Sequence, residues 1–365
     1  MNIATIKFDS FERLQSDDCQ DRIIKARKVL GEKIVILGHH YQNETVYRHA
    51  DYAGDSLKLA QYVQQLDAKY IVFLGVHFMA EVSDILSRDN QITVLPDLSA
   101  GCSMADMANL AKVERTYREI SKVLDFDQTI TPITYINSAA DLKAFCGEHN
   151  GIVCTSTNAP KILEWAFKQR QKVLFFPDQN LGRWTGYKMN IPLEDMTVWD
   201  PDLPLGGLTE KQIMDSKILL WKGHCAVHQM FRLEHIERFK ELHPDGFVIS
   251  HPESPFEVCQ NSDFVGSTEF ILKTIQKAEK NTKWLVGTEL NLVNRLANEM
   301  KSEGKLVQFM SHVVCECSTM ARIDPQHLAW TLENILKDSP VNIIKVKESE
   351  AKLAKLALDR MLAVT

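Results

Sequence analysis

The sequence lacks three features that would each point to a particular class of protein. Its longest apolar runs, such as residues 70–76, are much shorter than the roughly 20 residues of a membrane-spanning helix. Its N-terminus holds no apolar stretch of the length found in signal peptides. Basic residues are not in excess, because 42 lysines and arginines stand against 48 acidic residues, whereas nucleic-acid binders are usually basic. We therefore expect a cytoplasmic protein that binds neither membranes nor nucleic acid.

The composition is that of a folded protein with more than one domain. Of the 365 residues, 45% are hydrophobic and 25% are charged, which excludes a disordered chain. At roughly 150 residues per domain, two or three domains are expected. The chain has eight cysteines. Because disulfides are rare in the cytoplasm, these are expected to be buried thiols, nucleophiles or metal ligands.

Short apolar runs alternate with helical patterns, which favours parallel sheets covered by helices on both faces. The predicted strands are residues 33–37, 70–75, 91–95, 132–136, 151–154, 172–176, 246–249, 263–265 and 283–286. The clearest predicted helices are residues 57–65, 139–146, 161–169 and 289–300. Residues 182–208 are rich in proline and glycine and are expected to form a long surface loop, and residues 343–362 an amphipathic helix.

A pattern of strands followed by polar residues recurs three times. The first strand of each unit runs into His39, Tyr135 or His251, and a second and a third strand follow. We take the second strand of the first unit to be the one that ends at residues 75–77. A cysteine comes after the third strand of each unit, namely Cys102, Cys225 or Cys317.

The recurrence predicts an α/β protein of three αβα domains with small parallel sheets. Because ligands bind at the carboxyl ends of parallel strands, three such units with pseudo-threefold symmetry would surround one central active site. The expected domains are residues 20–105, residues 106–228 with an inserted loop at 182–208, and residues 229–330. A C-terminal helical segment would cover residues 331–365.

The cysteines of the three units suit a metal cluster. Three thiolates cannot complete a tetrahedral zinc site alone, but they fit a [4Fe–4S] cluster that keeps one iron open to substrate. The compact C-x-x-C-x-x-C spacing is absent, so this signal is weak by itself. Zinc held by Cys225, His228 or other histidines is the alternative.

Other polar residues after strands can serve as acids, bases or anion ligands. His251 and Glu253 form a usable acid–base pair. The pair Asp55-Ser56 is typical of a helix N-terminus, where Ser56 would either cap the helix or bind an anion. Ser267 and Thr268 offer hydroxyls for a phosphate or carboxylate, although a plain turn explains them equally well.

Taken in order, eleven blocks of sequence resemble the quinolinate synthases, the iron–sulfur enzymes of de novo NAD synthesis. The blocks are ILGHHYQ, DYAGDSLKLA, SAGCSMAD, ITYINS, CTSTNA, FFPDQNLGR, WKGHCAVH, SHPES, VGSTEFI, VGTELNLVNRL and CECSTMARI. The resemblance implies three αβα domains about a pseudo-threefold axis. It also implies a reaction that condenses iminoaspartate with dihydroxyacetone phosphate to quinolinate, phosphate and two waters.

The resemblance also assigns residues to roles. It implies a [4Fe–4S] cluster on Cys102, Cys225 and Cys317, the last preferred to Cys315 because of the residues that follow it. The implied catalytic residues are Tyr41, His251 and Glu253. The implied substrate-binding residues are His39, Ser56, Tyr135, Asn137, Ser156, His228, Ser267 and Thr268.

Partners and competing functions follow from the same comparison. An aspartate-oxidising enzyme is a plausible source of the unstable iminoaspartate. A zinc-dependent aldolase or hydrolase is one competing interpretation. A non-catalytic ligand-binding protein or iron–sulfur sensor is another. The metal content of the purified protein and a quinolinate assay distinguish the three.

Overall fold

The computed structural model describes residues 5–313 and 316–364. These residues form two compact units. The first unit comprises residues 5–102 and 316–347, and the second comprises residues 103–313 and 348–364. No helix in the described ranges is long and apolar enough to cross a membrane.

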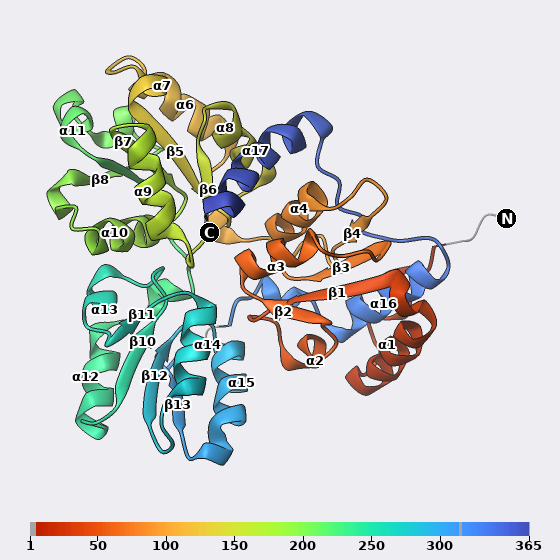
Figure 1. The fold of residues 1–365 in the computed structure, drawn as a ribbon. Helices are drawn as coiled ribbons and strands as arrows, with labels where there is room; N and C mark the ends of the chain where they lie inside the picture. The colour runs from red at the N-terminus through yellow and green to blue at the C-terminus, as the bar shows by residue number, and fades with distance from the viewer. Residues whose placement is uncertain (1–4, 314–315, 365) are drawn as a thin grey trace. The chain divides into compact units, whose positions relative to one another are not determined.

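The first unit is built on a four-stranded parallel sheet in the order β2-β1-β3-β4 (Figure 1). Its strands are β1 (Ile34–His39), β2 (Tyr52–Gly54), β3 (Tyr70–Leu74) and β4 (Ile92–Val94). Its helices are α1 (Ser16–Leu30), α2 (Glu44–Tyr47), α3 (Ser56–Val63), α4 (His77–Leu86) and α16 (Pro325–Leu336). Helices α1 and α16 pack against each other, so the two ends of this discontinuous unit share one core.

The second unit contains two further sheets, of which the first has five parallel strands in the order β6-β5-β7-β9-β8. These strands are β5 (Ile130–Tyr135), β6 (Ile152–Cys154), β7 (Lys172–Phe176), β8 (Met196–Trp199) and β9 (Ile218–Trp221). The helices around them are α5 (Ser103–Asp106), α6 (Leu110–Ile120), α7 (Phe126–Thr129), α8 (Ala140–Glu148), α9 (Ala159–Gln169), α10 (Gln179–Lys188), α11 (Glu210–Asp215) and α17 (Glu348–Val364).

The other sheet of the second unit has four parallel strands in the order β11-β10-β12-β13. They are β10 (Phe247–Ser250), β11 (Phe264–Val265), β12 (Lys283–Gly287) and β13 (Leu306–Phe309). The surrounding helices are α12 (Leu233–Leu242), α13 (Phe256–Gln260), α14 (Thr268–Lys277) and α15 (Leu290–Met300).

This last sheet shows why its strands read as continuous apolar runs. Alternate residues of a strand point to opposite faces. On β10, Val248 packs with helices α12 and α13, whereas its neighbour Ile249 packs with α14 and α15. On β12, Leu285 joins the first of these cores and Trp284 the second. Both faces are buried at these positions, so neighbouring residues of each strand are apolar.

The C-terminal helix α17 packs on α8 and against strand β6. The contact with α8 is so close that a Cβ added at Gly147 would lie 1.9 Å from the carbonyl oxygen of Leu353. Ala354, Ala357 and Leu358 are buried in the same contact region. The predicted C-terminal amphipathic helix is therefore confirmed, although it begins at Glu348.

Three sheets with parallel strands confirm the predicted fold class. The domain boundaries and the pseudo-threefold arrangement about a central site stay predictions. The predicted strands coincide, within two residues at each end, with nine of the strands in the described residues. The strands β2, β8, β9 and β13 were not predicted.

The prediction of a long loop at 182–208 is wrong. Most of α10 and the whole of β8 lie in this segment. Glycines occur inside the helix because it lies close to the sheet. A Cβ at Gly182 would come within 2.6 Å of Leu220, and one at Gly186 within 2.4 Å of the Met196 sulfur. These glycines permit close packing and do not mark a loop.

The strand pattern of the first unit needs a second correction. In each sheet the first strand, β1, β5 or β10, has a short edge strand on one side and a longer strand on the other. The edge strand of the first unit is β2, which sequence analysis missed, and not the strand that ends near residue 75. The strands β2, β6 and β11 are therefore equivalent, and so are β4, β9 and β13.

Candidate active site

The first strand of each sheet delivers a predicted site residue to its carboxyl end. His39 is the last residue of β1, Tyr135 is the last residue of β5, and His251 directly follows β10. His39, Tyr135 and His251 are all buried. The backbone N–H of Tyr41 donates to Nδ1 of His39 over 3.1 Å, and the two rings meet edge to face at 4.6 Å.

The edge strand of each sheet delivers a serine at one equivalent place. Ser56, Ser156 and Ser267 each lie two residues after the end of β2, β6 or β11. Ser56 is not the helix cap, because the Asp55 carboxylate accepts from the backbone N–H of Lys58 over 3.0 Å. Ser267 caps α14, and the next residue, Thr268, is buried.

The last strand of each sheet leads to a predicted cysteine ligand. Cys102 follows the end of β4 by eight residues, and Cys317 follows the end of β13 by the same number. Cys225 follows the end of β9 by four residues. Cys315 lies outside the described residues. The equal spacing of Cys102 and Cys317 supports the choice of Cys317.

Burial separates these three cysteines from the other four that the structure describes. Cys102, Cys225 and Cys317 are partly exposed, whereas Cys19, Cys146, Cys154 and Cys259 are buried. Burial raises the pKa of each of the four buried thiols, to about 12 for Cys259. A buried protonated thiol is a poor metal ligand. Among the seven cysteines that the structure describes, Cys102, Cys225 and Cys317 are therefore the thiols best suited to bind a metal.

Glu253 is the centre of a buried polar group in the second unit. Its carboxylate accepts a hydrogen bond from the hydroxyl of Tyr135, with an oxygen–oxygen distance of 2.6 Å. Nδ1 of His228 lies 3.0 Å from the other carboxylate oxygen, and Nδ1 of His251 lies 3.9 Å from the first. The rings of His228 and His251 stack at 4.8 Å. Four predicted site residues from both sheets of this unit are thus in contact.

The protonation states of this group follow from its burial. Burial lowers the pKa of His251 to about 3, with the charge of Glu253 opposing and that of His228 reinforcing the shift, so the imidazole is neutral. Burial acts to raise the pKa of Glu253. The imidazoles of His251 and His228 and the hydrogen bonds from His228 and Tyr135 outweigh it, so the pKa lies below its usual range. Glu253 is therefore an ionised carboxylate with a hydroxyl and an imidazole as its nearest proton carriers.

Sequence analysis missed two residues of this site, Asp178 and Asn180. The Asn180 side-chain amide donates to the backbone oxygen of Glu253 over 3.1 Å. Asp178 is fully buried and caps α10 by accepting from the N–H of Leu181 over 2.8 Å. Burial, followed by the charge of Glu253, raises the pKa of Asp178 well above its usual value. The available signal was their place directly after β7, in the block FFPDQNLGR.

Asn137 has an unsatisfied polar atom at the end of β5. Its side-chain oxygen is buried and has no hydrogen-bond partner in the part of the chain that the structure describes. Buried polar atoms without partners are uncommon in folded proteins, and a bound water, ion or ligand can supply the missing partner. This observation supports the predicted role of Asn137 in substrate binding.

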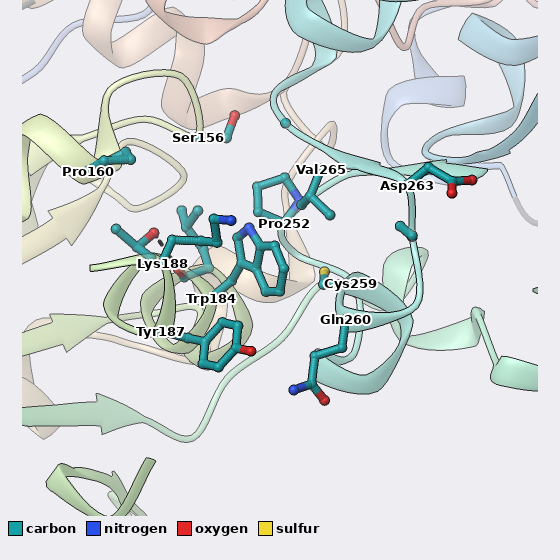
Figure 2. Close-up of a pocket in the computed structure, with 14 residues that line it drawn as sticks. Ser156, Pro160, Trp184, Tyr187, Lys188, Pro252, Cys259, Gln260, Asp263 and Val265 are labelled. Atoms are coloured by element: carbon teal, nitrogen blue, oxygen red, sulfur yellow. Dashed lines mark hydrogen bonds between the residues drawn. The ribbon is translucent and has the colours of Figure 1, made fainter. Parts of the chain in front are cut away.

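A pocket of about 510 Å³ opens in the second unit beside Ser156 (Figure 2). Pro252, which separates His251 from Glu253, forms part of its wall, and so does Gly266, which precedes Ser267. Trp184 of α10 forms another part of the wall, and the ammonium group of Lys188 lies 5.8 Å from its ring centroid. The pocket has the size of a small-molecule site.

A mononuclear metal site is the alternative that the geometry offers. The side chains of Cys225, His228 and Glu253 each offer one ligand atom, and these atoms lie within 4.8 Å of one another. The predicted site residues are distributed over the two units. His39, Tyr41, Ser56, Cys102 and Cys317 lie in the first unit, and the other predicted site residues lie in the second. The convergence of the three cysteines therefore stays a prediction.

Parallel α/β sheets with a buried carboxylate, a buried neutral imidazole and part-exposed thiols after their strand ends are typical of an enzyme. Comparison with known proteins agrees. The family model described as "Quinolinate synthetase A protein" matches residues 21–363. The chain belongs to this family of enzymes.

Individual relatives match over nearly the whole chain. A quinolinate synthase of Rhodopirellula baltica is 51% identical over 366 residues, covering 97% of this chain and 93% of the relative. One of Herpetosiphon aurantiacus is 47% identical and covers 100% of this chain and 97% of the relative. One of Corynebacterium glutamicum is 48% identical over 357 residues, with 98% and 90% covered.

Proposed function

We propose that this protein is a quinolinate synthase that condenses iminoaspartate with dihydroxyacetone phosphate to quinolinate, phosphate and two waters. The membership of the chain in the quinolinate synthetase A family supports this function, since the family model matches nearly the whole chain. The observation in the structure that carries the proposal is the buried contact of Tyr135, His228 and His251 with the carboxylate of Glu253.

Glu253 is proposed to move protons during condensation and ring closure. Its ionised carboxylate can take a proton from a carbon next to a carbonyl or imine group. The Tyr135 hydroxyl donates to this carboxylate and stabilises its negative charge. His251 accepts at Nδ1 from the N–H of Glu253 over 3.4 Å, so its proton resides on Nε2. From there the neutral imidazole can donate a hydrogen bond to a substrate oxygen.

The serines at the edge strands are proposed to bind the anionic parts of the substrates. Ser56, Ser156 and Ser267 have equivalent places at the starts of helices or turns, where hydroxyls and backbone N–H groups favour anions. Asn137 adds its buried amide oxygen, which could accept a hydrogen bond from a substrate donor. His39 and Tyr41 are proposed to contact substrate in the first unit, with Tyr41 as a further acid or base.

The proposed cofactor is a [4Fe–4S] cluster held by Cys102, Cys225 and Cys317. The donor set fits, because these are the three partly exposed thiols among the described cysteines. An iron–sulfur cluster with an open iron supplies a Lewis acid for substrate hydroxyl or carboxylate groups. A cytoplasmic location and a supplying aspartate-oxidising enzyme also stay predictions.

Anaerobic purification and an assay test this function. We expect a brown protein with about four iron and four sulfide per chain and quinolinate formation from the two substrates. Replacing Cys102, Cys225 or Cys317 by serine should abolish the brown colour, and replacing Cys315 should preserve it. A colourless Cys315→Ser protein would reverse the ligand assignment.

The second candidate function is that of a mononuclear metal enzyme, which the proximity of Cys225, His228 and Glu253 favours. Both carboxylate oxygens of Glu253 already face Tyr135 and His228, so metal binding there would have to displace these contacts. One zinc per chain, with activity that survives exposure to air, would support this candidate and reject the cluster.

A further inference from the structure

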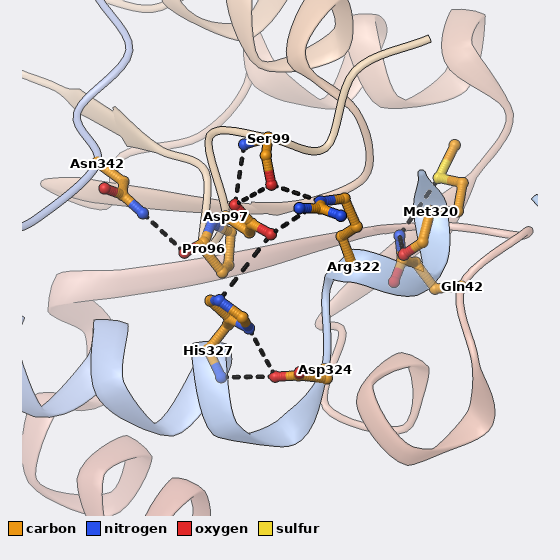
Figure 3. Close-up of polar contacts among 9 residues, drawn as sticks. All are labelled: Gln42, Pro96, Asp97, Ser99, Met320, Arg322, Asp324, His327 and Asn342. Carbon is orange, nitrogen blue, oxygen red and sulfur yellow. Dashed lines mark hydrogen bonds and ion pairs between the residues drawn. The ribbon is translucent and has the colours of Figure 1, made fainter. Parts of the chain in front are cut away.

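An ion pair in the first unit joins the segments that carry two of the proposed cluster ligands (Figure 3). Asp97 lies five residues before Cys102, and Arg322 lies five residues after Cys317. Nε of Arg322 is 3.3 Å from one carboxylate oxygen of Asp97 and also donates to the hydroxyl of Ser99. Each contact connects residues more than 220 positions apart in the sequence.

On the Cys102 side, the chain between Asp97 and the cysteine is held in a tight turn. The other carboxylate oxygen of Asp97 accepts from the backbone N–H of Ser99 over 2.9 Å and from its hydroxyl over 2.6 Å. Backbone bonds from Ala100 to Asp97 and from Gly101 to Ser99 continue the turn. A side chain that orders this turn therefore also orders the approach to Cys102.

On the Cys317 side, a second turn leads from the cysteine to Arg322. The N–H of Ala321 donates to the backbone oxygen of Cys317 over 3.0 Å. The Cys317 sulfur lies 3.3 Å from the hydroxyl of Thr319. Arg322 ends the short 3-10 helix η7 (Met320–Arg322), so its backbone position is coupled to that of the cysteine.

Helix α16 supports the pair from below. Asp324 caps this helix by accepting from the N–H of His327 over 2.7 Å, and it also contacts Nδ1 of His327 at 2.8 Å. The other ring nitrogen of His327 lies 3.9 Å from Asp97, and the ring of Phe8 stacks on the imidazole at 4.0 Å. Asp97 thus faces the side chains of Arg322 in η7 and of His327 in α16.

The solvent exposure of the Asp97–Arg322 ion pair indicates that it orients the neighbouring segments more than it stabilises the fold. The Arg322 side chain is 51% exposed, and that of Asp97 is 18% exposed. Ion pairs this exposed to water add little to folding stability. Outer groups that orient metal ligands nevertheless have a large effect on metal retention.

We propose that Asp97 and Arg322 are positioning residues that hold the turns of Cys102 and Cys317 in the arrangement that binds the metal cluster. This inference rests on the proposed function for the identity of the cluster. It concerns residues outside the set of ligands and substrate contacts, and it makes Arg322 the link between two ligands of the first unit.

The principal test compares Arg322→Gln with a matched control, Arg88→Gln. Arg88 pairs with Asp67 in the same unit, and its side chain is 56% exposed. After anaerobic reconstitution, the release of iron to a chelator is followed by the loss of visible absorbance. We expect Arg322→Gln to lose its cluster about tenfold faster than the wild type, and Arg88→Gln to match the wild type. Asp97→Asn should resemble Arg322→Gln, and Arg322→Lys should restore part of the retention.

Hydrogen exchange on the cluster-free proteins supplies a readout that does not depend on the cofactor. We expect Arg322→Gln to raise amide exchange in both segments, 97–104 and 316–324, with an unchanged unfolding temperature. Exchange altered in 316–324 alone, or iron release equal to that of the control, would overturn the proposal. If the wild type binds no iron, but Arg322→Gln still raises exchange in both segments, the proposed cofactor is rejected and the positioning contact is kept.

Discussion

The substitution Glu253→Gln tests the proposed chemistry most directly. It removes the negative charge but keeps the volume of a side chain that is 4% exposed. The carboxylate holds the Tyr135 hydroxyl at 2.6 Å and His228 at 3.0 Å, and a neutral amide cannot accept from both with equal strength. Hydrogen bonds to charged groups contribute about 1.5–3 kcal/mol each. Since the amide also needs less desolvation than the carboxylate, the net change in folding stability should be small.

Activity should change far more than stability. Loss of a positioned acid or base lowers rates by about 10²–10⁴-fold, which corresponds to about 3–5 kcal/mol of barrier at 1.36 kcal/mol per factor of ten. The assay measures quinolinate formation under anaerobic conditions, with iron content and unfolding temperature measured on the same preparation. We expect a full complement of iron and a rate reduced by at least a hundredfold.

The control for this substitution is Glu257→Gln. Glu257 lies four residues further along the same segment and is exposed, so its variant should keep the wild-type rate. Wild-type turnover in Glu253→Gln would remove Glu253 from the mechanism. Lost activity together with lost iron or a lowered unfolding temperature would show a structural role in its place.

Three further predictions concern the metal, the fold and pH. Cys225→Ser should lose the cluster, whereas Cys259→Ser, which changes a buried thiol, should keep it; iron analysis of both variants decides. Gly147→Ala should destabilise the protein by about 1–3 kcal/mol, because the new methyl group overlaps the α17 backbone; denaturant unfolding measures this. Burial, with help from neighbouring arginines, lowers the pKa of His49 to about 4 from 6.5, so the unfolded chain binds the proton more tightly. The contribution of His49 to the free energy of unfolding is complete above pH 6.5 and falls by at most about 3 kcal/mol on acidification to pH 4. The variant His49→Gln should therefore show a flatter dependence of unfolding free energy on pH in this range. An unchanged slope would contradict the argument.

The sequence predicted the longer buried strands because their apolar runs are unambiguous. It missed β2 and β13, which are a three-residue edge strand and a strand with polar or exposed positions. It also missed β8, which lies in the segment 182–208 where proline and glycine favoured a loop, and β9, a fully buried strand of only four residues. The close packing that explains Gly182 and Gly186 depends on residues of other strands and has no local signature.

The candidate site was predictable to a similar degree. Residues directly after strands, such as His251 and Glu253, carry a local signal, and their contact is present in the structure. Asp178 and Asn180 escaped because their meaning depends on a contact with Glu253, more than 70 residues away. The link between Asp97 and Arg322 escaped for the same reason.

The discontinuity of the two units has a consequence for biosynthesis. When residues 5–102 have been synthesised, all four strands of the first sheet are present. Helix α16, which packs on α1, lies more than 200 residues further along the chain and has not yet been made. The second unit waits even longer, because α17 is its last helix. Neither unit can therefore complete its core during translation until almost the whole chain has emerged. Termination before α16 is made is thus expected to leave two unfinished cores, whereas termination between α16 and α17 leaves only the core of the second unit unfinished.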